Sequence, residues 1–167
     1  MLVDMYSKKV FNMAYQFCGS YQEAEDLTQD IFLKLYRQLD KYDFGKNFTA
    51  WLLTLVKNYL IDNYRRTKWE KRQREDFDER LHSAPAAGGP EAGMLEKDNK
   101  KILREGMNRL SPDIRMSIIL KEIQGKKYEE VAEIMGLPVG TVKSRINRGR
   151  LQLAKILHDK KEKTHGL

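Results

Sequence analysis

Apolar residues recur along most of this chain at every third or fourth position, which is the spacing of one face of an α-helix. The pattern predicts a first helix over Leu2–Cys18 and a second over Glu23–Leu39. The stretch DKYDFGKNF, residues 40–48, interrupts the pattern with a glycine and three aromatic residues. Helical spacing resumes over Leu52–Asn63, and we expect that helix to fray in the mixed-charge run 65–80. The sequence shows no strand pattern, so the chain is predicted to be all-α.

A segment rich in proline, glycine and alanine divides the chain. SAPAAGGPEAG, residues 83–93, holds two of the four prolines and three of the eleven glycines. That composition is typical of flexible linkers. We therefore predict two small helical domains, 1–76 and 95–167, joined by a flexible linker over 77–94. The second domain is expected to open with a charged helix, followed by a helix that Ser111 caps.

The second domain also contains two helices joined by a tight turn. YEEVAEIM, residues 128–135, keeps its apolar residues on one face, and Gly136 ends that helix. The next helix places Val142, Ile146, Gly149, Leu153 and Ile156 along one side. This is a helix-turn-helix arrangement, in which Gly149 is expected to pack closely against the preceding helix. The opposite side of the second helix presents polar and basic residues that can read base edges in a DNA major groove.

The charge distribution supports a polyanionic partner. The net charge is +7, and residues 111–167 carry twelve Lys or Arg against seven Asp or Glu. A single cysteine, Cys18, excludes an internal disulfide and suits a reducing cytosol. We find no signal peptide, and no apolar run approaches the roughly 20 residues that cross a bilayer. The sequence contains no metal-ligand cluster, phosphate loop or nucleophile–base pair, so we predict a cytoplasmic protein that is not an enzyme and has no cofactor.

The first domain presents two further surfaces. In AEDLTQDIFLKLY, residues 24–36, an acidic and polar face surrounds Leu33, which suits a protein partner better than a phosphate backbone. The aromatic residues around Gly45 alternate with lysines, a pattern that suits stacking on single-stranded DNA, although we expect Phe48 to belong to the core. On the following helix we expect Thr54, Asn58, Ile61 and Arg65 to face outward, where Asn58 could contact the edge of an extruded base.

These motifs resemble a known family. LSPDIRMSIILKEIQGKKYEEVAEIMGLPVGTVKSRINRGR is similar to the region-4 signature of bacterial sigma factors, especially the extracytoplasmic-function (ECF) group. AEDLTQDIFLKLY followed by FTAWLLTLVKNYLIDNYRR resembles region 2 of the same group. The two motifs occur in the family's order and are separated by the predicted linker.

The resemblance implies a set of partners and contact residues. The partners are core RNA polymerase, promoter DNA and, as for many members, an anti-sigma factor. On the polymerase, the implied docking sites are the clamp helices of the largest subunit and the flap of the second-largest. The residues implied to contact core polymerase are Asp26, Gln29, Asp30 and Leu33. Those implied at the minus-10 element are Tyr42, Phe44, Lys46, Trp51, Asn58 and Arg65. Those implied at the minus-35 element are Thr141, Lys143, Ser144, Asn147 and Arg148.

Two alternatives remain open at this stage. A stand-alone helix-turn-helix regulator would bind duplex DNA without polymerase and would have no use for an aromatic melting loop. A helical nucleic-acid enzyme with a DNA-binding tail could use Asp26 and Asp30 to hold magnesium, although two carboxylates alone make a weak chelate. For the sigma factor we expect the free chain to be compact and to bind promoter duplex weakly until polymerase holds its halves apart.

Overall fold

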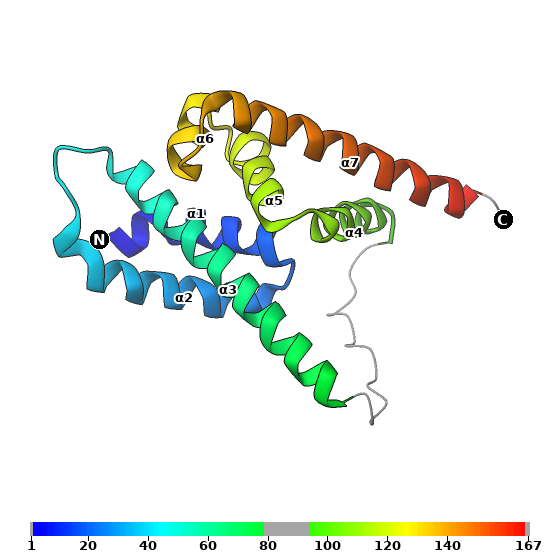
Figure 1. Cartoon of the computed structure of the whole chain (residues 1–167), viewed down its shortest axis with the longest axis horizontal. Helices are drawn as coiled ribbons and strands as arrows, with labels where there is room; N and C mark the ends of the chain where they lie inside the picture. Colours follow the sequence, from blue (N-terminus) through cyan, green and yellow to red (C-terminus); the bar gives the residue numbers. More distant parts are fainter. Residues whose placement is uncertain (1, 79–93, 166–167) are drawn as a thin grey trace.

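The computed structural model describes the backbone of residues 2–78 and 94–165 and the side chains of residues 2–75 and 98–163. These residues form seven α-helices and two short helical turns, without a strand (Figure 1). The elements are α1 (Leu2–Cys18), α2 (Tyr21–Gln38), η1 (Leu39–Lys41), α3 (Phe48–Asp78), α4 (Met94–Arg109), α5 (Pro112–Ile118), η2 (Ile119–Ile123), α6 (Tyr128–Met135) and α7 (Val139–His165). The all-α prediction is confirmed, and most of the predicted linker, 77–94, lies outside the described residues. None of the described helices is long and apolar enough to cross a membrane.

Helix α2 begins two residues earlier than its apolar spacing predicted. Ser20 is its N-cap, and the Ser20 hydroxyl accepts a hydrogen bond from the N–H of Glu23 at 3.3 Å. This contact satisfies one of the free N–H groups of the first turn, so the helix starts at Tyr21. Gly19, with a φ of 76°, makes the left-handed turn between α1 and α2. The predicted inner face of α2 is buried, from Ala24 to Leu35.

Helix α3 contradicts the prediction that it frays beyond Arg65. It continues without interruption to Asp78, a length of 31 residues, although its described residues after Tyr64 are all exposed. Its sequence contains no glycine or proline, and most residues of the charged run are Lys, Arg, Glu or Gln, which are good helix formers. Local propensity therefore maintains the helix where no core covers it, and its last turns project from the body of the molecule (Figure 1).

The C-terminal half packs α4, α5 and α6 against the long helix α7. The hydroxyl of Ser111 accepts from the N–H of Ile114 at 3.4 Å, as expected of the predicted cap of α5. Gly149 explains how closely α5 approaches α7: a Cβ added there would lie 2.4 Å from Cδ1 of Ile118 and 2.7 Å from Cγ2 of Ile114. The close packing predicted at Gly149 is confirmed, but the helix that it contacts is α5 rather than the directly preceding helix, α6.

Arg115 of α5 joins the two halves of the molecule. Arg115 is only 2% exposed, and its guanidinium carbon lies 5.0 Å from the ring centroids of both Phe17 and Tyr64. One terminal nitrogen donates to the carbonyl of Phe17 at 3.0 Å, and the other donates to the carbonyls of Asn108 and Leu110. Burial lowers the pKa of Arg115. The carbonyls and ring faces offset the cost of desolvating the cation.

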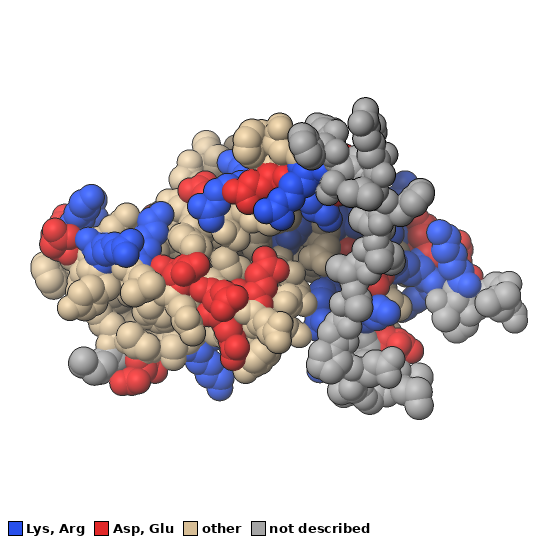
Figure 2. Space-filling view, turned by 90° about the horizontal axis from the view of Figure 1, so that it is seen from below, with Lys and Arg blue, Asp and Glu red and all other residues tan. Residues whose placement is uncertain are grey.

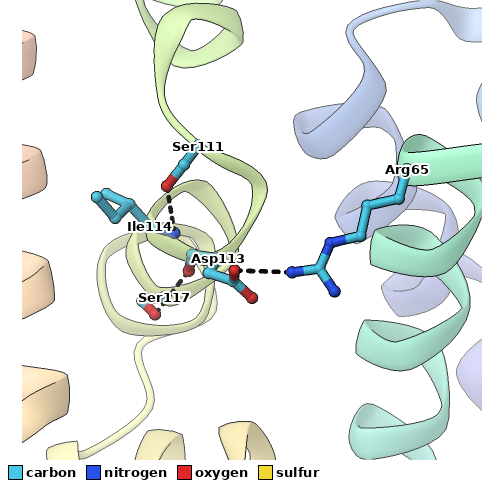
Figure 3. A network of polar contacts seen from close by, with 5 residues as sticks. All are labelled: Arg65, Ser111, Asp113, Ile114 and Ser117. Carbon is cyan, nitrogen blue, oxygen red and sulfur yellow. Dashed lines mark hydrogen bonds and ion pairs between the residues drawn. The ribbon is translucent and has the colours of Figure 1, made fainter. Parts of the chain in front are cut away.

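Two further contacts connect the halves. Arg65 of α3 donates to Asp113 at the start of α5 over 3.0 Å, and Figure 3 shows the two side chains pointing toward one another. The guanidinium of Arg104 lies 5.1 Å from the ring centroid of Tyr15 and donates to its hydroxyl. These polar and cation–ring contacts join residues more than 45 positions apart in the sequence, and they add to the apolar packing between the halves.

Candidate nucleic-acid and polymerase interfaces

The predicted polymerase-binding face lies on α2 and is exposed. Asp26, Gln29 and Asp30 point away from the buried side, and Leu33 is 58% exposed. Tyr36, one turn further, is 83% exposed and enlarges the apolar part of this face, which the sequence reasoning missed. Its spacing of three residues from Leu33 was the available signal. Seen from below, Figure 2 shows acidic side chains gathered near the middle of the surface.

Tyr59 supports this face from α3. Its hydroxyl donates to Oδ2 of Asp30 at 3.0 Å. Burial raises the pKa of Tyr59, and the hydrogen bond to Asp30 raises it further. Asp30 is thus partly committed to a contact inside the chain. Within the described residues, no three His, Cys, Asp or Glu side chains gather as a group able to hold a metal ion.

The aromatic residues in and beside the loop between η1 and α3 differ in exposure: some pack against one another, and one faces solvent. Tyr42 lies at the centre, with its ring centroid 5.2 Å from those of Phe44 and Phe48 and 5.1 Å from that of Trp51. The Tyr42 hydroxyl donates to the carbonyl of Lys46, which closes the loop. Phe44 is 88% exposed, whereas the other three rings are half-buried. Among these aromatic residues, Phe44 is therefore the one free to stack on a base.

The outward face of α3 is partly covered. Asn58 and Arg65 are exposed as expected, whereas Thr54 is half-buried. Ile61, which we also expected to face outward, is only 5% exposed. The prediction for Ile61 is wrong because the C-terminal half packs over this side of α3. A pocket of about 220 Å³ lies between α3 and the C-terminal half. Asn58 and Arg65 line it on one side, and Asp113 and residues of the helix-turn-helix line it on the other.

The helix-turn-helix has the predicted arrangement. Gly136, with a φ of 67°, ends α6 in the left-handed conformation. Helix α7 begins at Val139, inside the stretch 137–140 that we expected to form the turn. Val142 and Ile146 are fully buried. The opposite side of α7, which we call the recognition face, carries the five residues predicted to contact the minus-35 element. Thr141 is half-buried, and the other four are exposed: Lys143, Ser144, Asn147 and Arg148.

An aromatic and cationic cluster borders the recognition helix, and the sequence reasoning did not find it. The ring centroid of Tyr128, the first residue of α6, lies 4.6 Å from the ammonium of Lys121 and 5.5 Å from that of Lys143. Beside it, Arg150 donates through Nε to Glu122 at 2.6 Å, and a hydrogen bond to Glu122 raises the pKa of Arg150. Lys143 therefore lies toward the edge of the recognition face, against a tyrosine, rather than at its centre.

Comparison with known proteins explains why these surfaces occur together. Sigma-70 region 2 matches residues 2–70, and Sigma-70, region 4 matches residues 100–153. The ECF RNA polymerase sigma factor SigW of Bacillus subtilis is 32% identical over 166 residues, which are 95% of this chain and 88% of that protein. This chain belongs to the ECF sigma factors. The ECF RNA polymerase sigma-E factor of Escherichia coli is 35% identical over 157 residues, 90% of this chain and 81% of that protein.

A solved structure supports the same assignment for this ECF sigma factor. The sigma factor RpoE of Bartonella quintana, crystallised with the anti-sigma factor NepR, superposes with a TM-score of 0.70 at 29% identity, covering 93% of this chain and 94% of that one. The match to region 2 in the N-terminal half favours a sigma factor over a stand-alone helix-turn-helix regulator, which would need only the C-terminal half.

Proposed function

We propose that this ECF sigma factor binds core RNA polymerase, directs it to promoters with particular minus-10 and minus-35 elements, and helps to open the duplex. One observation carries the proposal: a single chain presents both an exposed face on the α2 of region 2 and an exposed helix-turn-helix in region 4. The polymerase supplies the chemistry of transcription, and the chain itself acts as an initiation factor without catalytic activity. Such a factor works beside the chromosome, so we place it in the cytoplasm.

For polymerase binding, α2 would dock on the clamp helices of the largest subunit and region 4 on the flap of the second-largest. Leu33 and Tyr36 provide an exposed apolar centre, and Asp26, Gln29 and Asp30 provide a polar surround. An apolar centre with a polar rim is the usual anatomy of a protein interface. We expect Asp26→Lys to weaken binding to core polymerase while the helical content of the chain stays unchanged. Unchanged affinity in competition with another sigma factor would remove this assignment.

For the minus-10 element, Phe44 and Asn58 are the best-placed residues. Phe44 can stack on an unpaired base, a contact worth about 1–3 kcal/mol. Asn58 has both a donor and an acceptor for the edge of an extruded base. Tyr42, Lys46 and Trp51 would then act mainly by shaping the loop. We expect Asn58→Ala to impair promoter opening more than closed-complex formation, as followed by permanganate footprinting.

For the minus-35 element, the positions on α7 divide into two roles. Asn147 and Arg148 are exposed at the centre of the recognition face, where Arg can pair with guanine and Asn with adenine. Lys143 lies against Tyr128 together with Lys121 at the edge of that face, which suits the phosphate backbone. Thr141 and Ser144 lie near the start of the helix and can contact either.

The two roles predict different effects in a promoter library. Arg148→Ala should cost about 1–3 kcal/mol and relax sequence preference at one base pair. Lys143→Ala should weaken binding uniformly across sequences and reduce the salt slope by about one. Identical sequence logos for the wild type and Arg148→Ala would refute base reading by Arg148.

Promoter binding also requires the halves to separate. The arrangement described here covers Ile61 and engages Arg65 with Asp113 on the minus-10 face of α3. The two promoter elements, about one and a half turns apart, are separated by about 50 Å at roughly 34 Å per turn. We propose that core polymerase holds the halves apart, so that the free chain binds promoter duplex weakly. A titration against specific and scrambled promoters, with and without core polymerase, tests this. Tight, specific binding by the free chain would favour the stand-alone regulator instead.

An anti-sigma factor is a further proposed partner. The Bartonella quintana relative was crystallised with one, and its likeness to this chain extends over both halves. Co-purification of the chain from its native cell, followed by release of the bound protein and recovery of transcription with core polymerase, would test this proposal.

A further inference from the structure

Leu151 is an exposed apolar side chain on the polar recognition face of α7. It is 65% exposed, whereas the other valine, leucine and isoleucine residues in the described part of α7 are buried or half-buried. A single exposed leucine among polar residues is common on protein surfaces and by itself indicates nothing. The position of Leu151 is what gives it meaning, because it lies on the face that we propose to enter the major groove of the minus-35 element.

Leu151 lies between the two proposed base readers around the helix axis. At 100° per residue, it is about 40° from Asn147 and about 60° from Arg148. Counted from Ser144, which is also exposed, these three residues occupy the spacings i+3, i+4 and i+7. The recognition helix of homeodomains reads bases from four positions with this same spacing. The distance from Ser144 to Leu151 is about 10.5 Å along the axis, or about three base pairs at 3.4 Å per step.

The surroundings of Leu151 favour DNA over a protein partner. Arg148 and Lys155, about one turn before and one turn after it, are exposed on the same side of α7. The helix contains no Asp or Glu before Asp159, so no carboxylate there would repel a phosphate backbone. The centre of a protein interface is instead depleted of charged residues. The chemistry around this leucine is therefore that of a nucleic-acid surface.

We propose that Leu151 contacts the C5-methyl group of a thymine at the minus-35 element and fixes the promoter preference at that base pair. The inference rests on the proposed function, since it requires α7 to lie in the major groove. A leucine side chain has no hydrogen-bonding group, and the thymine methyl is the apolar feature that base edges present in this groove. Against another base, Leu151 would take a polar edge out of water without replacing its hydrogen bonds. It thus selects thymine by attraction and disfavours the other bases by desolvation.

The experiment uses the complete holoenzyme, made from core polymerase and the full chain. Transcription of a promoter library by the wild type and by Leu151→Ala first identifies the base pair at which the preference for thymine is lost. Two duplex probes are then made from a promoter that the wild type transcribes. One carries thymine at that position, and the other carries deoxyuridine, which lacks only the C5-methyl group. Holoenzyme binding to both probes is measured at fixed salt.

Two further variants make the comparison specific. Leu151→Met keeps an unbranched apolar side chain of similar size, so it should retain the contact with the methyl group. Gln152→Ala is the matched control, because Gln152 is exposed and lies about 100° from Leu151 around the axis. None of the three substitutions changes a charge, so the salt slope should stay the same in all of them.

We expect the wild type and Gln152→Ala to bind the thymine probe about 3- to 5-fold more tightly than the deoxyuridine probe, as for the burial of one methyl group. Leu151→Ala should bind the two probes nearly equally, and Leu151→Met should keep most of the preference. Competition with another sigma factor should show that Leu151→Ala binds core polymerase as tightly as the wild type does.

Three outcomes would overturn the proposal. If Leu151→Ala still prefers thymine to deoxyuridine by the full factor, another residue reads the methyl group. If the wild type and Leu151→Ala give the same sequence logo, or the wild type does not distinguish the two probes, Leu151 reads no base. If Leu151→Ala loses affinity for core polymerase and for both probes alike, Leu151 contacts the polymerase. A wild-type holoenzyme that transcribes no promoter would instead refute the proposed function, so the two failures are distinguishable.

Discussion

Gly149 allows a sharp test of how region 4 is packed. In Gly149→Ala, the added methyl carbon would meet Cδ1 of Ile118 at 2.4 Å and Cγ2 of Ile114 at 2.7 Å. Both separations are far shorter than the roughly 3.5–4.0 Å at which carbon atoms attract. The clash would force α5 away from α7, and overpacking of this kind costs about 1–3 kcal/mol. Alanine recovers about 1 kcal/mol because it is a better helix former than glycine.

The cost of the clash should lie in the upper part of that range, and the gain in helix propensity offsets part of it. Because two atoms lie below 3.0 Å, we expect the free energy of unfolding to fall by about 1–2 kcal/mol after the propensity gain. Urea unfolding followed by circular dichroism measures the change. Gly140→Ala is the matched control, because no heavy atom lies within 4 Å of its added Cβ. It should leave stability unchanged or raise it by up to about 1 kcal/mol.

A second variant isolates the clash. Ile118→Val removes Cδ1, the atom that the added methyl would meet first. Alone it should cost about 0.5–1.5 kcal/mol. Combined with Gly149→Ala it should cost less than the sum, with a coupling of at least about 0.5 kcal/mol. If Gly149→Ala proves as stable as Gly140→Ala, or if the double variant is additive, α5 and α7 do not pack as closely as described.

Three further predictions concern the junction between the halves. Arg65→Glu should place two carboxylates together and increase the radius of gyration of the free chain in small-angle scattering, while adding Asp113→Arg should reverse the change; no reversal would refute the pairing. Arg115→Met should lower the free energy of unfolding by about 2–4 kcal/mol, because buried carbonyls lose their donor, and an unchanged urea midpoint would contradict this role. Burial raises the pKa of the Cys18 thiol, so the native chain binds that proton more tightly than the unfolded chain, and stability should fall as the pH rises through the ordinary thiol pKa. Alkylation by iodoacetamide at pH 8 should accordingly be slower in buffer than in urea, and equal rates would contradict the burial of Cys18.

Local signals in the sequence determined most of the secondary structure. Helical apolar spacing predicted α1 and the inner faces of α2 and α7, because a period of 3.6 residues per turn can be read directly from the order of apolar residues. The cap at Ser111 and the turn at Gly136 were equally visible, since a hydroxyl before a helix and a glycine after it act on their immediate neighbours. The error on α3 came from treating a charged run as a helix end when its residues favour the helix.

Only the tertiary structure decided which faces meet. Ile61 appeared to face outward on an isolated α3, but the C-terminal half covers it. Nothing in the local sequence indicates that Arg115 is buried against the carbonyl of Phe17, 98 residues away. From the sequence, Lys143 could contact either a base or a phosphate, and its position against the ring of Tyr128 favours the phosphate. In each case the deciding partner is distant in the sequence or lies across a turn, and no local periodicity records such contacts. The apolar period of a helix follows from its own residues, whereas the neighbour that covers one of its faces depends on how the whole chain packs.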